Sequence, residues 1–415
     1  MMQILTSTLL GLIAATIVLA ALVWVLVRSL PRTRGRLRAE TARLDEPSRR
    51  SAATLLSGWG GAGGWALAAG IGTYVVLRVT GFFWHRRIID VALDPLEEAN
   101  NQYAHDQQAC EMLATSGVAD SEAATAKCLD GLIETPTAIY NDAAPMLLGI
   151  LAPVLAALVS LAVLALLLAR LRNPKIGNGA MVSAGLRPRG IFSFGPRWAL
   201  AIPALTALVL ISWLVVTGLF SSRDGYGRYA ILTVERHVSV SDPSVGRVPP
   251  LTPALQMESF PGWYYGVPVA ATALAVLVLS LLLLRALARA PRSTERQLLG
   301  IDDLARTLKA KLVAGLAGAG LLATLATVAI LSGGAMLTLA GDERMDGPSV
   351  EHFYHDTMLS GVYVVICAIL FSIMALLMVV LALAAVLELS TARRLAVAVA
   401  LGEEPEPGPR VRQSH

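Results

Sequence analysis

The hydrophobic residues of the chain gather in seven long runs separated by polar segments. The runs are Ile4–Val27, Gly60–Phe83, Met146–Ala169, Trp198–Phe220, Trp263–Leu284, Leu312–Leu337 and Met358–Leu387. Each is longer than the roughly 20 residues that a helix needs to cross a hydrocarbon layer about 30 Å thick. Helices of this length in a soluble protein would need a polar face toward water, and these runs offer none. The pattern predicts an all-α integral membrane protein with seven transmembrane helices.

The composition supports this interpretation and narrows the function. Of the 415 residues, 55% are hydrophobic and 15% are charged, whereas soluble domains contain roughly 25% charged residues. Neither a phosphate-binding loop nor a nucleophile elbow occurs, so energy for any transport must come from a separate subunit. An ordinary soluble enzyme is excluded, and we name no catalytic residue and expect no cofactor.

Positive charge accumulates in every second polar segment. Arg28–Leu56, Arg170–Arg197, Arg285–Lys311 and the tail after Leu387 together hold 25 of the 34 Lys and Arg residues and 10 of the 30 acidic residues. Cationic loops are retained in the cytoplasm, so we expect a plasma-membrane protein with its N-terminus outside and its C-terminus inside. The same rule explains the basic charge without a nucleic-acid partner, and the expected partner is the lipid bilayer.

Together these features predict the organisation of the chain. It comprises a first transmembrane hairpin with a basic cytoplasmic loop (1–83), an extracytoplasmic segment (84–145), a second hairpin (146–220), an extracytoplasmic segment (221–262), a third hairpin (263–339), an extracytoplasmic loop (340–357), a seventh transmembrane helix (358–388) and a cytoplasmic tail whose end we expect to be disordered (389–415). Within 221–262, the alternation in ILTVERHVSV predicts a strand, and the following PSVGRVPPLTP predicts a rigid loop. We expect the three outer segments to form a small cap.

Two cysteines, Cys110 and Cys128, lie in the longest outer segment, and Cys367 lies in the seventh run. Outside the cytoplasm the redox environment permits disulfides. A Cys110–Cys128 bridge would stabilise the cap by roughly 3 kcal/mol in the chain-entropy model. Two free thiols are the alternative. Cys367 is most simply a small apolar side chain among the helices.

The sequence EHFYHD contains the one group of residues with metal-ligand spacing. It includes Glu351, His352, His355 and Asp356. On a helix His352 and His355 share a face and could meet one cation. Solvated surface histidines are the simpler interpretation, so we expect no metal. A membrane enzyme acting through Glu351, His352 and His355 would require one.

The segment Thr294–Leu312 reads as an amphipathic helix. Its apolar face contains Leu298, Ile301, Ala305, Leu308 and Leu312. Asp302 and Arg306 form an i,i+4 pair beside this face. The face can be interpreted as a docking surface for a cytoplasmic partner such as an ATPase, through Leu298, Ile301, Ala305 and Leu308. Alternatively, the segment is an extension of the sixth run that lies at the membrane interface.

Small residues four apart occur in two of the runs. Gly60 and Gly64 open the second run, and Gly315 and Ala319 lie in the sixth. This spacing lets helix backbones approach closely, either within the protein or between copies in a homo-oligomer.

Two segments in the middle of the chain carry a resemblance. GLRPRGIFSFGPRWALAIP (Gly185–Pro203) and SFPGWYYGVPVA (Ser259–Ala270) resemble a group of uncharacterised actinobacterial multi-pass membrane proteins. The resemblance covers runs four to six, about a third of the chain. Such proteins look like membrane partners of transport ATPases, and the resemblance implies a similar role here without assigning any residue.

The sequence is therefore compatible with two functions. The leading one is the permease-like or accessory membrane component of a transport complex, energised by a separate ATPase or other subunit. The alternative is a non-transporting receptor or scaffold whose outer cap binds a ligand or envelope partner. The absence of Asp and Glu from the middle of the runs favours this alternative, because transport usually needs ionisable groups there.

Overall fold

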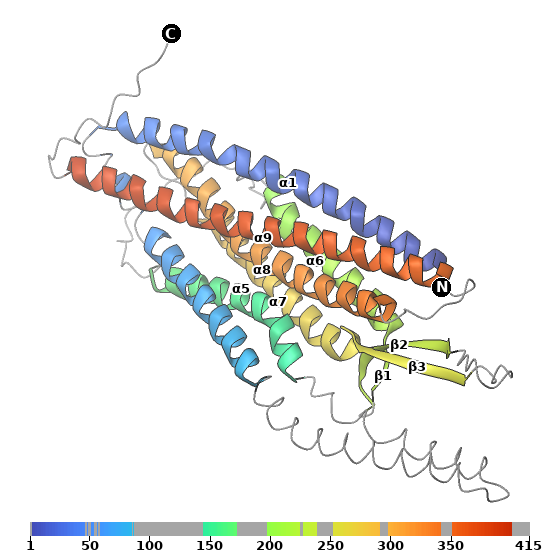
Figure 1. Ribbon diagram of the computed structural model, residues 1–415. Helices are drawn as coiled ribbons and strands as arrows, with labels where there is room; N and C mark the ends of the chain where they lie inside the picture. Colours follow the sequence, from blue (N-terminus) through green and yellow to red (C-terminus); the bar gives the residue numbers. More distant parts are fainter. Residues whose placement is uncertain are drawn as a thin grey trace, which may run out of the picture.

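The fold is a bundle of long helices with a small β-sheet at one end (Figure 1). The computed structural model describes residues 2–45, 48, 51–53, 56, 59–84, 86, 144–171, 197–224, 227–238, 252–290, 298–341 and 351–400. The labelled helices are α1 (Met2–Ala42), α5 (Ala144–Leu171), α6 (Arg197–Phe220), α7 (Trp263–Arg289), α8 (Leu299–Gly341) and α9 (Glu351–Ala400). A further helix, Trp59–Trp84, lies between α1 and α5 in the chain.

Among the residues that the structure describes, six helices are long and apolar enough to cross a membrane, which supports a multi-pass membrane protein. They are Trp59–Trp84, Met146–Arg170, Ala201–Phe220, Trp263–Arg289, Leu299–Ala340 and Met358–Arg394. They correspond to runs two to seven of the sequence. The first run lies within α1, where the described apolar part, Gly11–Trp24, is shorter than a span. A seventh span therefore stays a prediction.

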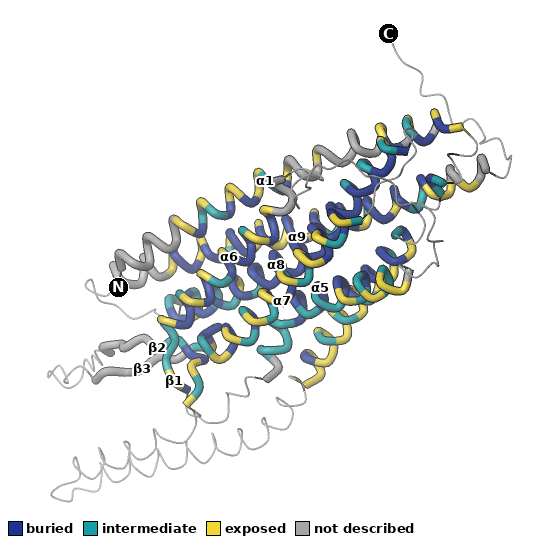
Figure 2. The backbone as a smooth tube through the Cα atoms, turned by 180° about the vertical axis from the view of Figure 1, so that it is seen from behind, coloured by how far each residue is buried: buried dark blue, intermediate teal, exposed yellow. Residues whose placement is uncertain are grey.

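Helix α8 forms the centre of the bundle. It packs against α5, α6, α7 and α9, and every residue from Leu308 to Leu322 is buried. Figure 2 shows buried residues along α8 and exposed residues on the outer faces of the surrounding helices. A helix that is apolar all round is expected at such a central place. The sixth run is thus the core of the protein.

Glycines in α8 let its neighbours approach closely. A Cβ at Gly315 would lie 3.0 Å from the Cβ of Ala382 in α9, and one at Gly320 would lie 2.2 Å from that of Ala157 in α5. Gly60 packs against Ser390, whereas no atom would lie within 4 Å of a Cβ at Gly64. Gly60 and Gly315 therefore serve helix packing inside the protein.

Most of the buried hydroxyl groups described in the bundle are satisfied within their own helices. Seven of them donate a hydrogen bond to a carbonyl three or four residues earlier, and they belong to Thr16, Ser160, Thr206, Thr217, Ser280, Thr324 and Ser332. A hydroxyl that bonds to its own helix needs no partner from a neighbouring helix. These seven hydroxyl groups therefore leave most of the contact between helices to packing, although Thr16 of α1 also meets the Cys367 thiol of α9.

A three-stranded antiparallel sheet follows α6 in the chain, so the prediction of a purely helical fold is incomplete. Its strands are β1 (Ser222–Arg223), β2 (Tyr229–Val238) and β3 (Thr252–Ser259), in the order β1-β2-β3. The predicted strand is confirmed as β2. The predicted rigid loop is wrong at its end, because Thr252 and Pro253 belong to β3 and face Val238 and His237. Proline is tolerated there because β3 is an edge strand.

Several predictions fall on residues that the structure does not describe. Cys110 and Cys128 lie outside the described residues, so the disulfide stays a prediction, as does a cap that includes it. Cys367 is described as a free, buried cysteine in α9, in line with its expected role as a small apolar side chain.

Candidate functional site at the charged end of the bundle

The end of the bundle opposite the sheet brings together the ends of several helices, and we call it the charged end. Helix α1 finishes here, where Glu40 approaches Gly300 near the start of α8. Helix Trp59–Trp84 begins here, with Gly60 against Ser390 near the end of α9. Figure 1 shows the sheet at the other end of these helices. Segments far apart in the sequence thus form one surface.

Buried charge is concentrated at this end. Among the described residues, six charged side chains are buried, and five of these lie here: Asp302, Arg306, Lys309, Lys311 and Glu388. The sixth, Asp224, lies beside the sheet. A charge removed from water is costly unless it is paired or hydrogen-bonded. The contacts of these five residues therefore decide what the charged end can do.

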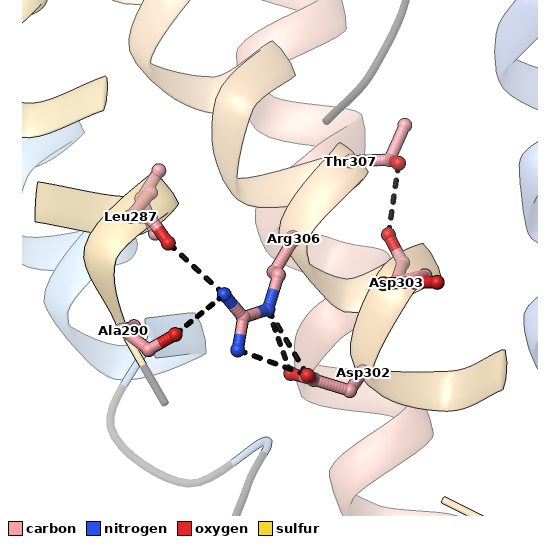
Figure 3. Close-up of polar contacts among 6 residues, drawn as sticks. All are labelled: Leu287, Ala290, Asp302, Asp303, Arg306 and Thr307. Carbon is pink, nitrogen blue, oxygen red and sulfur yellow. Dashed lines mark hydrogen bonds and ion pairs between the residues drawn. The ribbon is translucent and has the colours of Figure 1, made fainter. Parts of the chain in front are cut away.

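Arg306 joins α8 to α7 through two backbone carbonyls, and it also pairs with a carboxylate of its own helix (Figure 3). Its Nε lies 3.0 Å from each carboxylate oxygen of Asp302, and its Nη2 lies 2.9 Å from Oδ2. Its Nη1 donates to the carbonyls of Leu287, at 3.1 Å, and Ala290, at 2.9 Å. The last carbonyls of a helix lack partners within the helix, and a cation there is favourable. Arg306 thus caps α7 from the neighbouring helix.

Lys309 lies one turn further along α8. Its side chain is 8% exposed, and its Nζ lies 5.0 Å from the centre of the Trp59 ring. An ammonium over an indole face is held by a cation–π interaction. Lys311 is 1% exposed and Glu388 is 3% exposed, and each has a further contact of its own. The site therefore joins α8 to both α7 and helix Trp59–Trp84.

The apolar face proposed for docking is covered by the protein itself. Leu298, Ile301, Ala305 and Leu308 are each at most 1% exposed and belong to the hydrophobic core. Helix α8 continues without a break from Leu299 to Gly341, which agrees with the interpretation as an extension of the sixth run. These four side chains therefore contact the bundle, and a partner would have to meet other residues.

Sequence reasoning identified the Asp302–Arg306 pair but not the buried lysines. Lys309 follows Ala305 by four residues, so it lies beside the apolar face rather than opposite it. Its position beside this face is the feature of the sequence that indicates burial of Lys309. Nothing in the sequence predicts the contacts of Arg306 with Leu287 and Ala290, because they depend on how α7 and α8 pack together.

The proposed metal-ligand group lies at the start of α9. The stretch Glu351–Asp356 is helical, as the prediction that His352 and His355 share a helix face requires. The side chains of this stretch are not among those that the structure describes. Among the side chains that the structure describes, no group of three or more His, Cys, Asp or Glu residues could hold a metal ion.

A second, smaller set of charges lies beside the sheet. Arg228 Nε is 2.8 Å from Asp224 Oδ2, and the backbone N–H of Arg228 donates to Oδ1. The guanidinium also lies 5.3 Å from the centre of the Tyr264 ring. Partial burial acts against the charged form, but the hydrogen bond and charge of Asp224 outweigh it and raise the pKa of Arg228. The guanidinium therefore stays charged and holds the β1–β2 turn.

Comparison with known proteins assigns the chain to no family. No family model, curated protein or solved structure matches the chain.

Proposed function

We propose that the chain is a non-transporting membrane scaffold or receptor, whose binding surfaces lie at the two ends of its helix bundle. The observation that carries this proposal is the distribution of buried charge. Among the described residues, buried charged side chains occur at the charged end and beside the sheet, and not between them. Transport pathways usually need ionisable groups near the middle of the membrane. In the middle of α8, the hydroxyls of Thr324 and Ser332 donate to carbonyls of their own helix.

The proposal includes an orientation in the plasma membrane. The basic segments predicted to be cytoplasmic adjoin the charged end, and the positive-inside rule favours that end facing the cytoplasm. The sheet then faces outward as part of the cap, and α1 is a seventh span that starts outside. The outward face is where a receptor or scaffold of this kind would bind a ligand or envelope component.

A component of a transport complex is the second candidate. The buried charges at the charged end favour it, because ionisable residues within membrane helices often mark functional sites. A cytoplasmic ATPase or other subunit would meet the exposed ends of the helices rather than the buried face of α8. A homo-oligomer is compatible with either function.

Cysteine labelling in native membranes tests both the function and the orientation. Thr324→Cys and Ser332→Cys place a thiol among the buried residues of α8, in a parent that carries Cys367→Ala. We expect a membrane-impermeant thiol reagent not to label either position above the level of this parent. Water-accessible labelling of Thr324→Cys would contradict a filled core and favour the transport complex.

Two exposed positions serve as matched controls. Arg393→Cys lies near the end of α9, and Tyr229→Cys lies in β2. We expect Arg393→Cys to react only from the cytoplasmic side and Tyr229→Cys only from outside. The reverse pattern would contradict the orientation without affecting the argument about the core.

A further inference from the structure

The side chain of Lys309 is buried without a salt bridge to any carboxylate that the structure describes. It is 8% exposed, and its Nζ lies 5.0 Å from the centre of the Trp59 ring. No hydrogen bond or ion pair joins it to any residue in the described parts of the chain. Among the described residues, Trp213 Nε1 is the fully buried side-chain nitrogen without a hydrogen bond, and the Lys309 ammonium is not in that group. The ammonium therefore keeps a small contact with solvent, and its donors can meet a ligand.

The buried charges that the structure describes at this end include one more cation than anions. Arg306 is paired with Asp302, and both lie close enough to act on the charge of Lys309. Among the described residues that are buried here, three are cationic (Arg306, Lys309 and Lys311) and two are anionic (Asp302 and Glu388), while Glu40 and Asp303 are partly exposed. An unpaired buried ammonium is costly, and an anion at its tip would remove that cost.

The position of Lys309 matches the boundary of a bilayer. Helix α8 contains 43 residues and is about 64 Å long at 1.5 Å per residue, roughly twice the hydrocarbon thickness. Lys309 lies just before the apolar run that starts at Leu312, and Trp59 lies just before the run that starts at Gly60. Tryptophan is enriched at membrane–water interfaces. The pair therefore lies at the depth of lipid headgroups.

We propose that Lys309 and Trp59 form a binding site for the phosphate group of an anionic phospholipid. The ammonium supplies a point charge and up to three hydrogen-bond donors to the phosphate oxygens. The Trp59 ring keeps the ammonium between helix Trp59–Trp84 and α8. Basic pockets between membrane helices are suited to anionic headgroups. This site is separate from the scaffold proposal, because it concerns a lipid and not a protein or cap ligand.

Thermal unfolding of the purified full chain in neutral detergent tests the site. We expect phosphatidylglycerol to raise the midpoint temperature of the native protein, and phosphatidylcholine to have a much smaller effect. Lys309→Met should weaken the apparent affinity for phosphatidylglycerol by about tenfold or more, because it removes the charge but keeps the length of the side chain. Arg393→Met removes an exposed cation from the same end and should leave the affinity unchanged.

Further variants separate loss of binding from loss of folding. Without lipid, Lys309→Met should be at least as stable as the native protein, because it removes a buried charge that has no described anionic partner. Lys309→Arg should retain most of the lipid effect. Inorganic phosphate identifies the source of the ligand: Lys309-dependent stabilisation by phosphate alone would assign the site to a soluble phosphate compound, and its absence would assign the site to the lipid.

Two results would overturn the proposal. One is equal stabilisation of the native protein and Lys309→Met by phosphatidylglycerol. The other is the absence of any Lys309-dependent effect of both phosphatidylglycerol and phosphate. Neither result would change the cysteine-labelling test, so failure of the phosphate site and failure of the scaffold proposal can be told apart.

Discussion

Two Asp–Arg pairs with the same four-residue spacing lie at opposite ends of the bundle. In Asp302–Arg306, each side chain is 4% exposed, and the arginine reaches carbonyls in another helix. In Asp224–Arg228, the aspartate is 1% exposed and the arginine 23% exposed, and the contacts of the arginine include the turn that contains it and the ring of Tyr264. Equal spacing in the sequence thus leads to one pair that joins two long helices and one that is largely local.

The difference shows that the surroundings, more than the spacing, decide what such a pair contributes. Breaking a buried pair leaves a charge with no compensation, whereas an exposed pair contributes little. At the sheet end, close backbone packing joins the elements instead. A Cβ at Gly262 would lie 2.3 Å from the carbonyl oxygen of Tyr229 and 2.4 Å from the Cβ of Ser221.

The largest effect is expected from Arg306→Met. This change leaves the Asp302 carboxylate buried and removes two hydrogen bonds to the end of α7, so we expect a loss of about 3–5 kcal/mol. A lower midpoint of thermal unfolding and a smaller fraction of monodisperse protein in detergent would show it.

Two further variants give this prediction its controls. The double variant Asp302→Leu with Arg306→Met should recover part of the loss, because it removes both charges. Arg289→Met, an exposed position in the last turn of α7, should change the midpoint little. A double variant as unstable as the single one would show that the unpaired carboxylate is not the cause.

An intermediate effect is expected from Gly262→Ala at the sheet end. The added methyl group meets backbone that cannot rotate away, so we expect a loss of about 1–3 kcal/mol, as for overpacking elsewhere. The same measurement on Gly61→Ala, which has open space beside it, should show no loss. Equal stability of the two variants would mean that the sheet does not pack tightly against the start of α7.

The smallest effect is expected from Arg228→Gln. Asp224 keeps its hydrogen bond from the backbone N–H of residue 228, and the lost pair is partly exposed. We expect a loss of at most about 1 kcal/mol, which shrinks as the salt concentration rises. Unfolding midpoints in low and high salt measure it. A loss as large as that of Arg306→Met would remove the contrast between the two ends.

The sequence predicts the helical framework well, because long apolar runs carry their own signal. Six of the seven runs correspond to helices long enough to span a membrane, and the strand at Tyr229–Val238 follows from its alternating pattern. Its partner β3 is missed because Pro253 is a poor strand signal. The proline is tolerated because β3 lies at the edge of the sheet.

The candidate site depends on tertiary contacts that no local pattern reveals. The apolar face from Leu298 to Leu308 was identified, but the sequence cannot say whether it meets lipid, a partner or the protein itself. The pairing of Arg306 with Asp302 follows from the i,i+4 spacing, whereas its hydrogen bond to Ala290, sixteen residues earlier, has no signal in the sequence. Lys309 and Trp59 lie 250 positions apart, so their contact follows only from the arrangement of the helices.

The hydroxyl groups that bond to their own helices also bear on how the protein is made. Helix α5 can leave the translocon alone without exposing a hydroxyl that lacks a partner, because its Ser160 donates to a carbonyl of the same helix. Helices α7 and α8 differ, since the guanidinium of Arg306 and the last carbonyls of α7 satisfy each other only when both are present. Biogenesis should therefore release these two as a joined hairpin, while the others can enter one at a time.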